Sequence, residues 1–279
     1  MNRMDTDKRS FGKNGLNHIA KTFERLGSQG RAALMPYFTL GYPTAAKSLA
    51  VIEALARGGA DLIELGVPFS DPLADGPTIQ HSTQVALEQG MSVGRCLEMV
   101  ARIRARGVNQ PLLLMGYINP VLAYGAERYA ADASAVGADG LIVPDLPVEE
   151  ADALEAACRA HNLALVYLVS PASTPERVAA LASRSSGFLY LVSLTGVTGE
   201  RKSLSAGLAE FIARVRAATK MPLAVGFGIS TPAQARTVAE LADGVIIGSA
   251  LVRAAGEADD PPKAAEEFVR AMRAAMERS

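Results

Sequence analysis

Short apolar segments alternate with longer amphipathic ones along almost the whole chain. Eight segments are nearly continuous in apolar and β-branched residues, as strands that are buried on both faces are. These predicted strands are Ala33–Leu40, Asp61–Val67, Pro111–Tyr117, Gly140–Pro144, Leu163–Val169, Phe188–Val192, Pro222–Gly226 and Gly244–Ile247. Apolar residues recur at helical spacing in Ala45–Arg57, Val93–Arg106, Val148–His161, Pro175–Ser183, Leu208–Thr219, Thr231–Ala242 and Lys263–Glu277.

Eight strands that alternate with helices within about 250 residues predict an α/β fold, a single-domain (β/α)₈ TIM barrel. An open, doubly wound sheet is the alternative, but the first strand–helix turn, Gly41–Thr44, lacks the G-x-G-x-x-G pattern typical of that fold. A short additional helix, with Ile19, Phe23 and Leu26 on one face, is expected to close the bottom of the barrel. We therefore expect a flexible tail over residues 1–15 and the barrel over residues 16–279.

Composition and charge exclude several classes of protein. The 279 residues include 28 Lys and Arg against 29 Asp and Glu, so no basic surface indicates a nucleic-acid partner. Two isolated cysteines and three scattered histidines form neither a disulfide framework nor a metal site, so no metal is expected. A polar N-terminus and the lack of any apolar run of about 18 residues argue against secretion and membrane insertion. The expected location is the cytoplasm.

The second predicted strand carries a carboxyl group at a position where the core of a barrel normally has an apolar residue. Leu62, Glu64 and Gly66 lie on the same face of this strand, because side chains alternate along β-structure. Burial among apolar residues makes a carboxylate costly to ionise and raises its pKa, which suits a general acid/base. The alternative is a structural glutamate that is satisfied by a neighbouring donor.

The segment after this strand is a stiff loop with two further acids. Pro68–Gln80 contains several prolines together with Asp71 and Asp75. Active sites of TIM barrels form at the C-terminal ends of the strands, so either acid is a candidate there. Each could instead serve only the local turn.

Glycine-rich segments follow the last three strands. Thr195–Lys202 resembles a lid with glycine hinges, and Gly226–Ser230 and Gly248–Ala250 follow strands seven and eight. Backbone N–H groups of the last two loops, with a helix N-terminus, are typical of the phosphate site of such barrels. Glycines needed only for tight turns are the alternative. Other polar residues at strand ends are Thr39, Tyr117 and Tyr190, of which Tyr190 is either a core residue or a substrate contact.

These residues resemble one known family. The stretch Glu64–Gln80 (ELGVPFSDPLADGPTIQ) is similar to the signature of the tryptophan synthase α subunits. The resemblance covers roughly residues 16–275 and extends, in order, through Phe38–Pro43, Met115–Pro120, Pro144–Pro147, Gly196–Gly199, Gly226–Ser230 and Gly248–Ser249.

The resemblance implies a retro-aldol cleavage of indole-3-glycerol phosphate to indole and glyceraldehyde 3-phosphate. It implies Glu64 as acid/base, Asp75 as the partner of the indole N–H, and Tyr190 as a third active-site residue. It further implies phosphate binding by Gly199, Gly228, Gly248 and Ser249, and a substrate pocket that includes Tyr37, Thr39, Tyr117, Thr198 and Phe227. No cofactor is expected in this chain, because pyridoxal phosphate would belong to the β subunit of an α₂β₂ heterotetramer.

The chain departs from some family members, and other functions stay open. Some members carry phenylalanine at the position of Tyr37 and aspartate at that of Tyr42, and some carry arginine and serine where Leu194 and Thr195 stand. The alternatives are a sugar-phosphate epimerase or isomerase, a non-catalytic activator of a β-type partner, and an indole-releasing lyase that acts without a partner.

Overall fold

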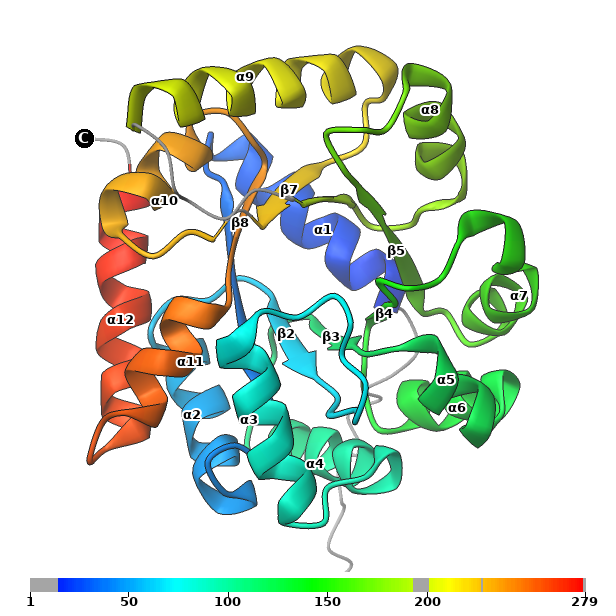
Figure 1. Ribbon diagram of the computed structural model, residues 1–279, viewed down its shortest axis with the longest axis vertical. Helices are drawn as coiled ribbons and strands as arrows, with labels where there is room; N and C mark the ends of the chain where they lie inside the picture. The colour runs from blue at the N-terminus through cyan, green and yellow to red at the C-terminus, as the bar shows by residue number, and fades with distance from the viewer. Residues whose placement is uncertain (1–14, 193–200, 227, 278–279) are drawn as a thin grey trace, which may run out of the picture.

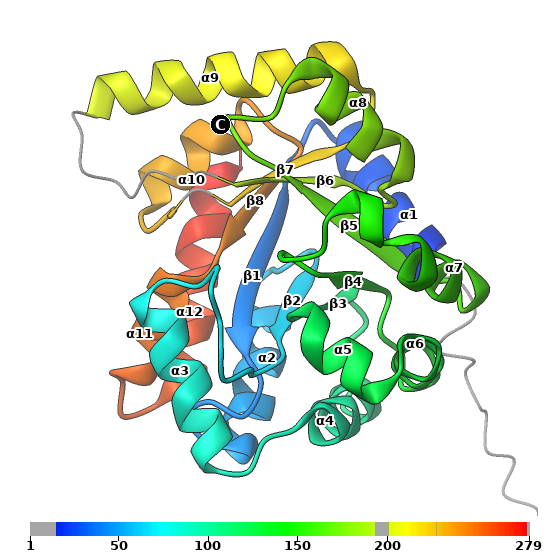
Figure 2. The same ribbon diagram turned by 45° about the vertical axis from the view of Figure 1, so that its right-hand side comes forward.

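The computed structural model describes residues 15–192, 201–226 and 228–277. Eight parallel strands form a closed barrel in chain order, each hydrogen-bonded to its neighbours, which confirms the expected (β/α)₈ fold (Figures 1 and 2). The strands are β1 (Ala33–Thr39), β2 (Ile63–Gly66), β3 (Leu112–Met115), β4 (Gly140–Ile142), β5 (Ala164–Val169), β6 (Leu189–Val192), β7 (Leu223–Gly226) and β8 (Gly244–Ile247).

Helices cover the outer side of the barrel and, in the case of α1, its N-terminal end (Figure 2). They are α1 (Gly15–Ser28), α2 (Ala45–Arg57), α3 (Pro77–Glu88), α4 (Val93–Ala105), α5 (Ile118–Tyr124), α6 (Ala126–Ala135), the 3₁₀ turn η1 (Val148–Glu150), α7 (Asp152–Ala160), α8 (Pro175–Arg184), α9 (Arg201–Ala218), α10 (Pro232–Ala239), α11 (Ser249–Gly256) and α12 (Pro261–Met276).

The sequence pattern did not reveal all of these helices. The segment Val148–His161, expected as one helix, is instead the turn η1 followed by α7. The physical reason is that the buried Val148, Ala151 and Leu154 are spaced by three residues, which favours a 3₁₀ turn at the start. The helices α3, α5 and α6 were not expected at all. The tail expected over residues 1–15 lies, apart from Gly15, outside the described residues.

Two apolar layers hold the barrel together. The outer layer packs the outward side chains of the strands against the helices. The inner layer fills the barrel with inward side chains such as Met35, Leu62 and Phe188, and it includes Ile19 and Phe23 of α1. The Phe23 and Phe188 rings lie 5.6 Å apart, so α1 closes the N-terminal end of the barrel, as the sequence predicted. The opposite end, where the strands finish, is left for a site.

A repeated polar contact ties the strands together in pairs at the closed end. Near the start of each odd-numbered strand, the N–H of a leucine donates to a side chain that stands just before the next strand, and that residue's own N–H donates back to the leucine carbonyl. The pairs are Leu34–Asp61, Leu112–Asp139, Leu165–Ser186 and Leu223–Asp243, with N···O distances of 2.8–2.9 Å to the side chains. The barrel thus has a fourfold repeat of strand pairs at this end.

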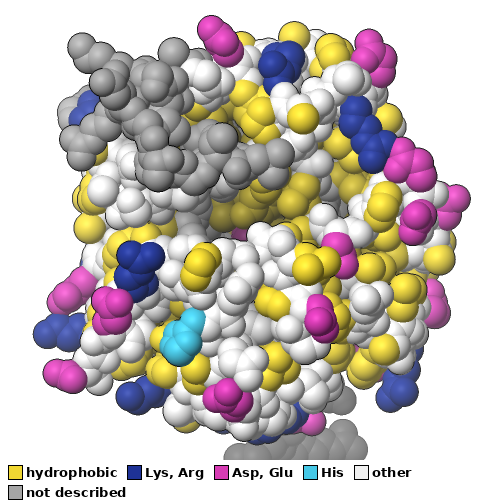
Figure 3. All heavy atoms as spheres, in the orientation of Figure 1, with side chains coloured by type: hydrophobic (Ala, Val, Ile, Leu, Met, Phe, Trp, Pro, Cys, Tyr) yellow, Lys and Arg dark blue, Asp and Glu magenta, His cyan; other side chains and the backbone are white. Residues whose placement is uncertain are grey.

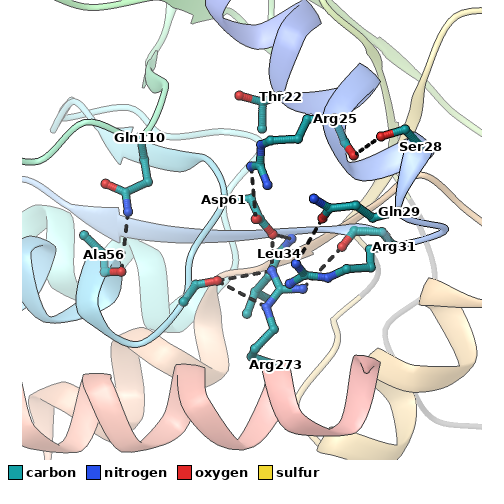
Figure 4. A network of polar contacts seen from close by, with 12 residues as sticks. Thr22, Arg25, Ser28, Gln29, Arg31, Leu34, Ala56, Asp61, Gln110 and Arg273 are labelled. Atoms are coloured by element: carbon teal, nitrogen blue, oxygen red, sulfur yellow. Dashed lines mark hydrogen bonds and ion pairs between the residues drawn. The ribbon is translucent and has the colours of Figure 1, made fainter. Parts of the chain in front are cut away.

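An arginine from a helix of the surrounding layer pairs with each of the three aspartates. Arg273 of α12 pairs with Asp61, as Figure 4 shows, and its Nε donates to the Gly59 carbonyl at 3.2 Å. Arg104 of α4 repeats both contacts, at 2.5 Å to Asp139 and 2.8 Å to the Gly137 carbonyl. Arg216 of α9 pairs with Asp243. Because Arg104 and Asp139 are both buried, we expect this copy to matter more for stability than the exposed Arg216–Asp243 copy.

Asp139→Asn is expected to lower the free energy of unfolding by about 3 kcal/mol, because it leaves the charge of Arg104 buried without its counter-charge. Asp243→Asn is the matched control, since the same pair there is 38% and 42% exposed and solvent screens it. Its expected loss is about 1 kcal/mol or less. Urea unfolding followed by circular dichroism measures both, and equal losses would contradict the expectation that the buried Asp139–Arg104 pair contributes more than the exposed one.

Candidate active site

Glu64 is an unpartnered acid inside the barrel. It lies in the middle of β2, its side chain is fully buried, and neither carboxyl oxygen has a hydrogen-bond partner among the described residues. Burial raises the pKa of Glu64 to about 8. At neutral pH the carboxyl group is therefore protonated, and its proton is not engaged in a hydrogen bond. This is the state of a general acid.

Two tyrosines flank Glu64 from β1 and β6. The side chains of Tyr37 and Tyr190 lean toward the next strand, where Gly66 and Gly226 make room for them. A Cβ atom at Gly66 would come 2.1 Å from the Tyr37 hydroxyl, and one at Gly226 would come 2.6 Å from the Tyr190 hydroxyl. Burial raises the pKa of both tyrosines above their ordinary value, and the nearby Glu64 adds to this, so both hydroxyls stay protonated.

Asp75 is held at the rim of the barrel by Tyr117. The Tyr117 hydroxyl, which follows β3, bonds to the Asp75 carboxylate and accepts the Ala74 N–H at 3.0 Å. The Tyr117 ring packs on Phe69 with ring centroids 5.5 Å apart. Burial raises the pKa of Asp75, and the hydrogen bond from Tyr117 opposes that shift. By contrast Asp71, on the same loop, is exposed and accepts a bond from Ser70, so the structure separates the two acids.

A cavity of about 1240 Å³ opens at the C-terminal ends of the strands. Figure 3 shows it as a hollow with a largely hydrophobic floor. Asp75, Tyr37 and Tyr190 line one part of it, together with apolar side chains from several strands: Met115, Leu168, Val192 and Ile246. Glu64 does not line the cavity in this state. No hydrogen bond from a described residue restrains its carboxyl group.

Another part of the cavity is suited to an anion. Gly228, Gly248 and Ser249 line it, and Ser249 is the first residue of α11. The N-cap of α11 is Gly248, which has no side chain to bond the free N–H groups of the first turn. The N-terminus of α10, in contrast, has a complete capping box from Thr231 and Gln234. The uncapped N–H groups and the dipole of α11 favour a phosphate there.

The other expected site residues fall into two groups. Thr198, Gly199 and Phe227 lie outside the described residues, as does most of the lid expected over Thr195–Lys202. Thr39 is fully buried and does not line the cavity, but bonds Ser82 at 2.7 Å.

Sequence reasoning missed several residues of the site. Arg253 of α11 lines the cavity and bonds Thr78 at the start of α3, and Ser82 lies inside α3. The inward apolar residues Leu168, Val192 and Ile246 could have been found from strand alternation. Nothing in the local pattern marks Arg253 or Ser82, because their roles depend on contacts between elements that are distant in sequence.

Neither a metal site nor a membrane span is present in the part of the chain that the structure describes. No group of three or more His, Cys, Asp or Glu side chains in residues 15–192, 201–226 and 228–277 is placed to hold a metal ion. Over the same part of the chain, no helix is long and apolar enough to cross a membrane.

Known proteins similar to this chain belong to one family. The family model described as tryptophan synthase alpha chain matches residues 23–279. The tryptophan synthase alpha chain of Chloroflexus aggregans is 54% identical over 85% of this chain and 89% of its own length. That of a Roseiflexus species is 50% identical over 92% of this chain and 100% of its own length.

Solved structures agree with the sequence relatives. A chain of tryptophan synthase from Mycobacterium tuberculosis is 41% identical, with a TM-score of 0.86 over 94% of this chain and 98% of its own. The tryptophan synthase alpha subunit of Legionella pneumophila is 37% identical, with the same TM-score and the same coverage. The residues matched include the strand ends that carry Glu64, Asp75 and the glycine loops. The chain therefore belongs to the tryptophan synthase alpha chain family.

Proposed function

We propose that Glu64 and Asp75 carry out the reaction of this family, the cleavage of indole-3-glycerol phosphate to indole and glyceraldehyde 3-phosphate. The observation that carries the assignment is the cavity itself. Asp75 and an uncapped helix N-terminus line it, and so do Tyr37 and Tyr190, the two tyrosines that flank the buried, unpartnered Glu64. The indole ring would lie over the apolar floor between the two acids, with the phosphate at Gly228, Gly248 and Ser249.

In the proposed chemistry one residue, Glu64, serves first as the acid and then as the base. The Glu64 carboxylic acid gives its proton to C3 of the indole ring, which becomes a cation, and the Asp75 carboxylate stabilises that cation through the ring N–H. The Glu64 carboxylate then takes the proton of the glycerol hydroxyl. The C–C bond breaks, its electron pair returns to the ring, and indole and the aldehyde leave. Glu64 ends the cycle protonated, so no cofactor is consumed.

The remaining site residues have positioning and binding roles in this proposal. Tyr190 is the third active-site residue, and its hydroxyl lines the cavity close to Glu64. Tyr37 lines the cavity, and Tyr117 lines a small separate pocket that shares Tyr37 and Asp75 with it; both tyrosines are assigned to substrate binding. Gly199, Thr198 and Phe227 are assigned to phosphate and pocket by family resemblance alone.

We also propose that this chain delivers indole to a β subunit in an α₂β₂ heterotetramer. The support is family membership, because alpha chains of this family partner with a β subunit that carries pyridoxal phosphate. Two buried cysteines without a disulfide agree with a reducing, cytoplasmic location. The polypeptide is proposed to consist of a tail over residues 1–15 and a barrel domain over residues 16–279.

Indole release from indole-3-glycerol phosphate, by the chain with and without a β subunit of the same source, tests the proposed function. We expect slow release by the chain alone and a steep increase with the partner. Fast release without a partner would indicate a lyase that acts alone. Absence of release in both cases, with turnover of a phosphorylated sugar instead, would favour an epimerase or isomerase.

The contact between Tyr117 and Asp75 predicts the direction in which the pH dependence of kcat/KM shifts when Tyr117 is changed. Tyr117→Phe removes the hydrogen bond that lowers the pKa of Asp75, so this pKa rises. Because Asp75 acts as a carboxylate, the acidic limb of kcat/KM is expected to move to higher pH by up to about one unit. Tyr124→Phe is the matched control, since it removes a 2.7 Å hydrogen bond to Asp132 away from the cavity. An unmoved acidic limb in Tyr117→Phe would contradict the assignment.

A further inference from the structure

A chain of buried hydroxyl groups runs from the wall of the cavity into helix α3. The Tyr37 hydroxyl oxygen lies 3.4 Å from Thr39 Oγ1, which lies 2.7 Å from Ser82 Oγ. Ser82 Oγ donates to the Ile79 carbonyl at 2.9 Å. Thr39 and Ser82 are fully buried, so no water competes for these contacts. We call Tyr37, Thr39 and Ser82 the hydroxyl relay.

The direction of every proton in the relay follows from counting donors. A hydroxyl has one proton to donate, and a carbonyl can only accept. The Ser82 proton is used on the Ile79 carbonyl, so Thr39 must donate to Ser82. The Thr39 proton is then used as well, and Tyr37 must donate to Thr39. The relay therefore points the proton of Tyr37 toward Thr39, and successive bonds of this kind polarise one another.

This direction matters because Tyr37 is a direct strand neighbour of the proposed acid. Tyr37 on β1 is paired in register with Glu64 on β2, and the two residues share the strand faces of the inward side chains Met35 and Leu62. Tyr190 on β6 also faces Glu64, and Asp75 and Tyr117 are coupled to Tyr37 from the neighbouring loops. Among the described residues, no Lys, Arg or His contributes to the raised pKa of Glu64.

We propose that the hydroxyl relay is a positioning device that withholds the Tyr37 proton from Glu64, so that Glu64 keeps its own proton until substrate arrives. This proposal rests on the proposed role of Glu64 as the acid. Without the relay, the buried Tyr37 hydroxyl would have a proton and no acceptor in its present place. The unpartnered Glu64 carboxylate is the acceptor it would turn to, and a hydrogen bond to the carboxylate favours ionisation.

Thr39→Val tests the relay, because it removes the acceptor of Tyr37 and keeps the shape of the side chain. The readout is the pH dependence of kcat/KM for cleavage by the full chain with its β subunit. We expect the alkaline limb, set by Glu64, to move to lower pH by about one unit. Thr22→Val, which removes a nearly buried hydroxyl of α1 at the closed end of the barrel, is the control and is expected to leave the limb in place.

A double variant separates a positioning role from a structural one. The double variant Thr39→Val/Tyr37→Phe lacks the Tyr37 hydroxyl, so no hydroxyl proton is left to bond Glu64. The alkaline limb is therefore expected to return to its wild-type position. An unmoved limb in Thr39→Val, or a shift that persists in the double variant, would overturn the proposal. A shift confined to the acidic limb would mean that the Tyr37 hydroxyl bonds Asp75 instead of Glu64, and it would also overturn the proposal.

Two further measurements apply if Thr39→Val does not fold or if the wild-type complex shows no cleavage. If Thr39→Val does not fold, Ser82→Ala cuts the relay one bond later, and the same direction of shift is expected because Thr39 can then donate to Tyr37. Lack of a shift in Ser82→Ala would in that case count against the relay. Absence of cleavage by the wild-type complex would instead remove the proposed function, so the two failures are distinguishable.

Discussion

Glu64→Gln is expected to lower kcat for cleavage of indole-3-glycerol phosphate by about 10²–10⁴-fold. The amide has nearly the same shape but cannot deliver a proton to the indole ring or take one from the glycerol hydroxyl. The substrate would still bind, since the phosphate and the ring contact other residues, so KM should change little. Steady-state indole release in the presence of the β subunit measures both constants.

The stability of the same variant provides the control. Glu64→Gln exchanges one unpartnered, neutral polar group for another of nearly the same size, so the free energy of unfolding should change little. A variant that loses activity together with stability would point to a structural role for Glu64. Near-normal kcat in a folded variant would remove Glu64 from the reaction altogether.

Asp75→Asn is expected to lower kcat by about 10²–10³-fold. The amide oxygen can still accept the indole N–H, but it lacks the negative charge that stabilises the cation formed when C3 is protonated. The effect should appear in kcat more than in KM, because the cation exists only after binding.

Asp71→Asn is the matched control for this prediction. Asp71 stands on the same loop, but it is exposed, and among the described residues its carboxylate accepts a hydrogen bond from Ser70 alone. Equal losses of kcat in the two variants would mean that the loop as a whole, rather than the charge of Asp75, supports the reaction.

Strand alternation and apolar periodicity were sufficient to predict the barrel. Parallel strands buried on both faces are nearly continuous in apolar residues, so each of the eight stood out, and Glu64 stood out within the second. Helices with a weaker apolar face, such as α3 and α5, were not visible in this way. The pairing of Asp139 with Arg104 was also hidden, because the partners lie 35 residues apart in sequence.

Family resemblance added roles that local patterns could not assign. The pattern left Asp71 and Asp75 equivalent, and only the fold shows that Tyr117 holds Asp75 at the cavity while Asp71 faces solvent. For Thr39, the position in the structure differs from the one that the resemblance implied. It was expected in the substrate pocket, whereas the structure places it behind Tyr37 in contact with Ser82. A contact between a strand and a helix that follows it more than 40 residues later leaves no signature in sequence.

The pH dependence of kcat/KM for indole release is the most direct test of the central claim that a buried, protonated Glu64 is the acid. Glu64 acts in its protonated form, and burial raises its pKa to about 8, so activity should fall as the pH rises through that value. Asp75 acts ionised, so activity should also fall at low pH, starting above the ordinary range of an aspartate. Activity that stays constant or increases through pH 8 and above would contradict the account.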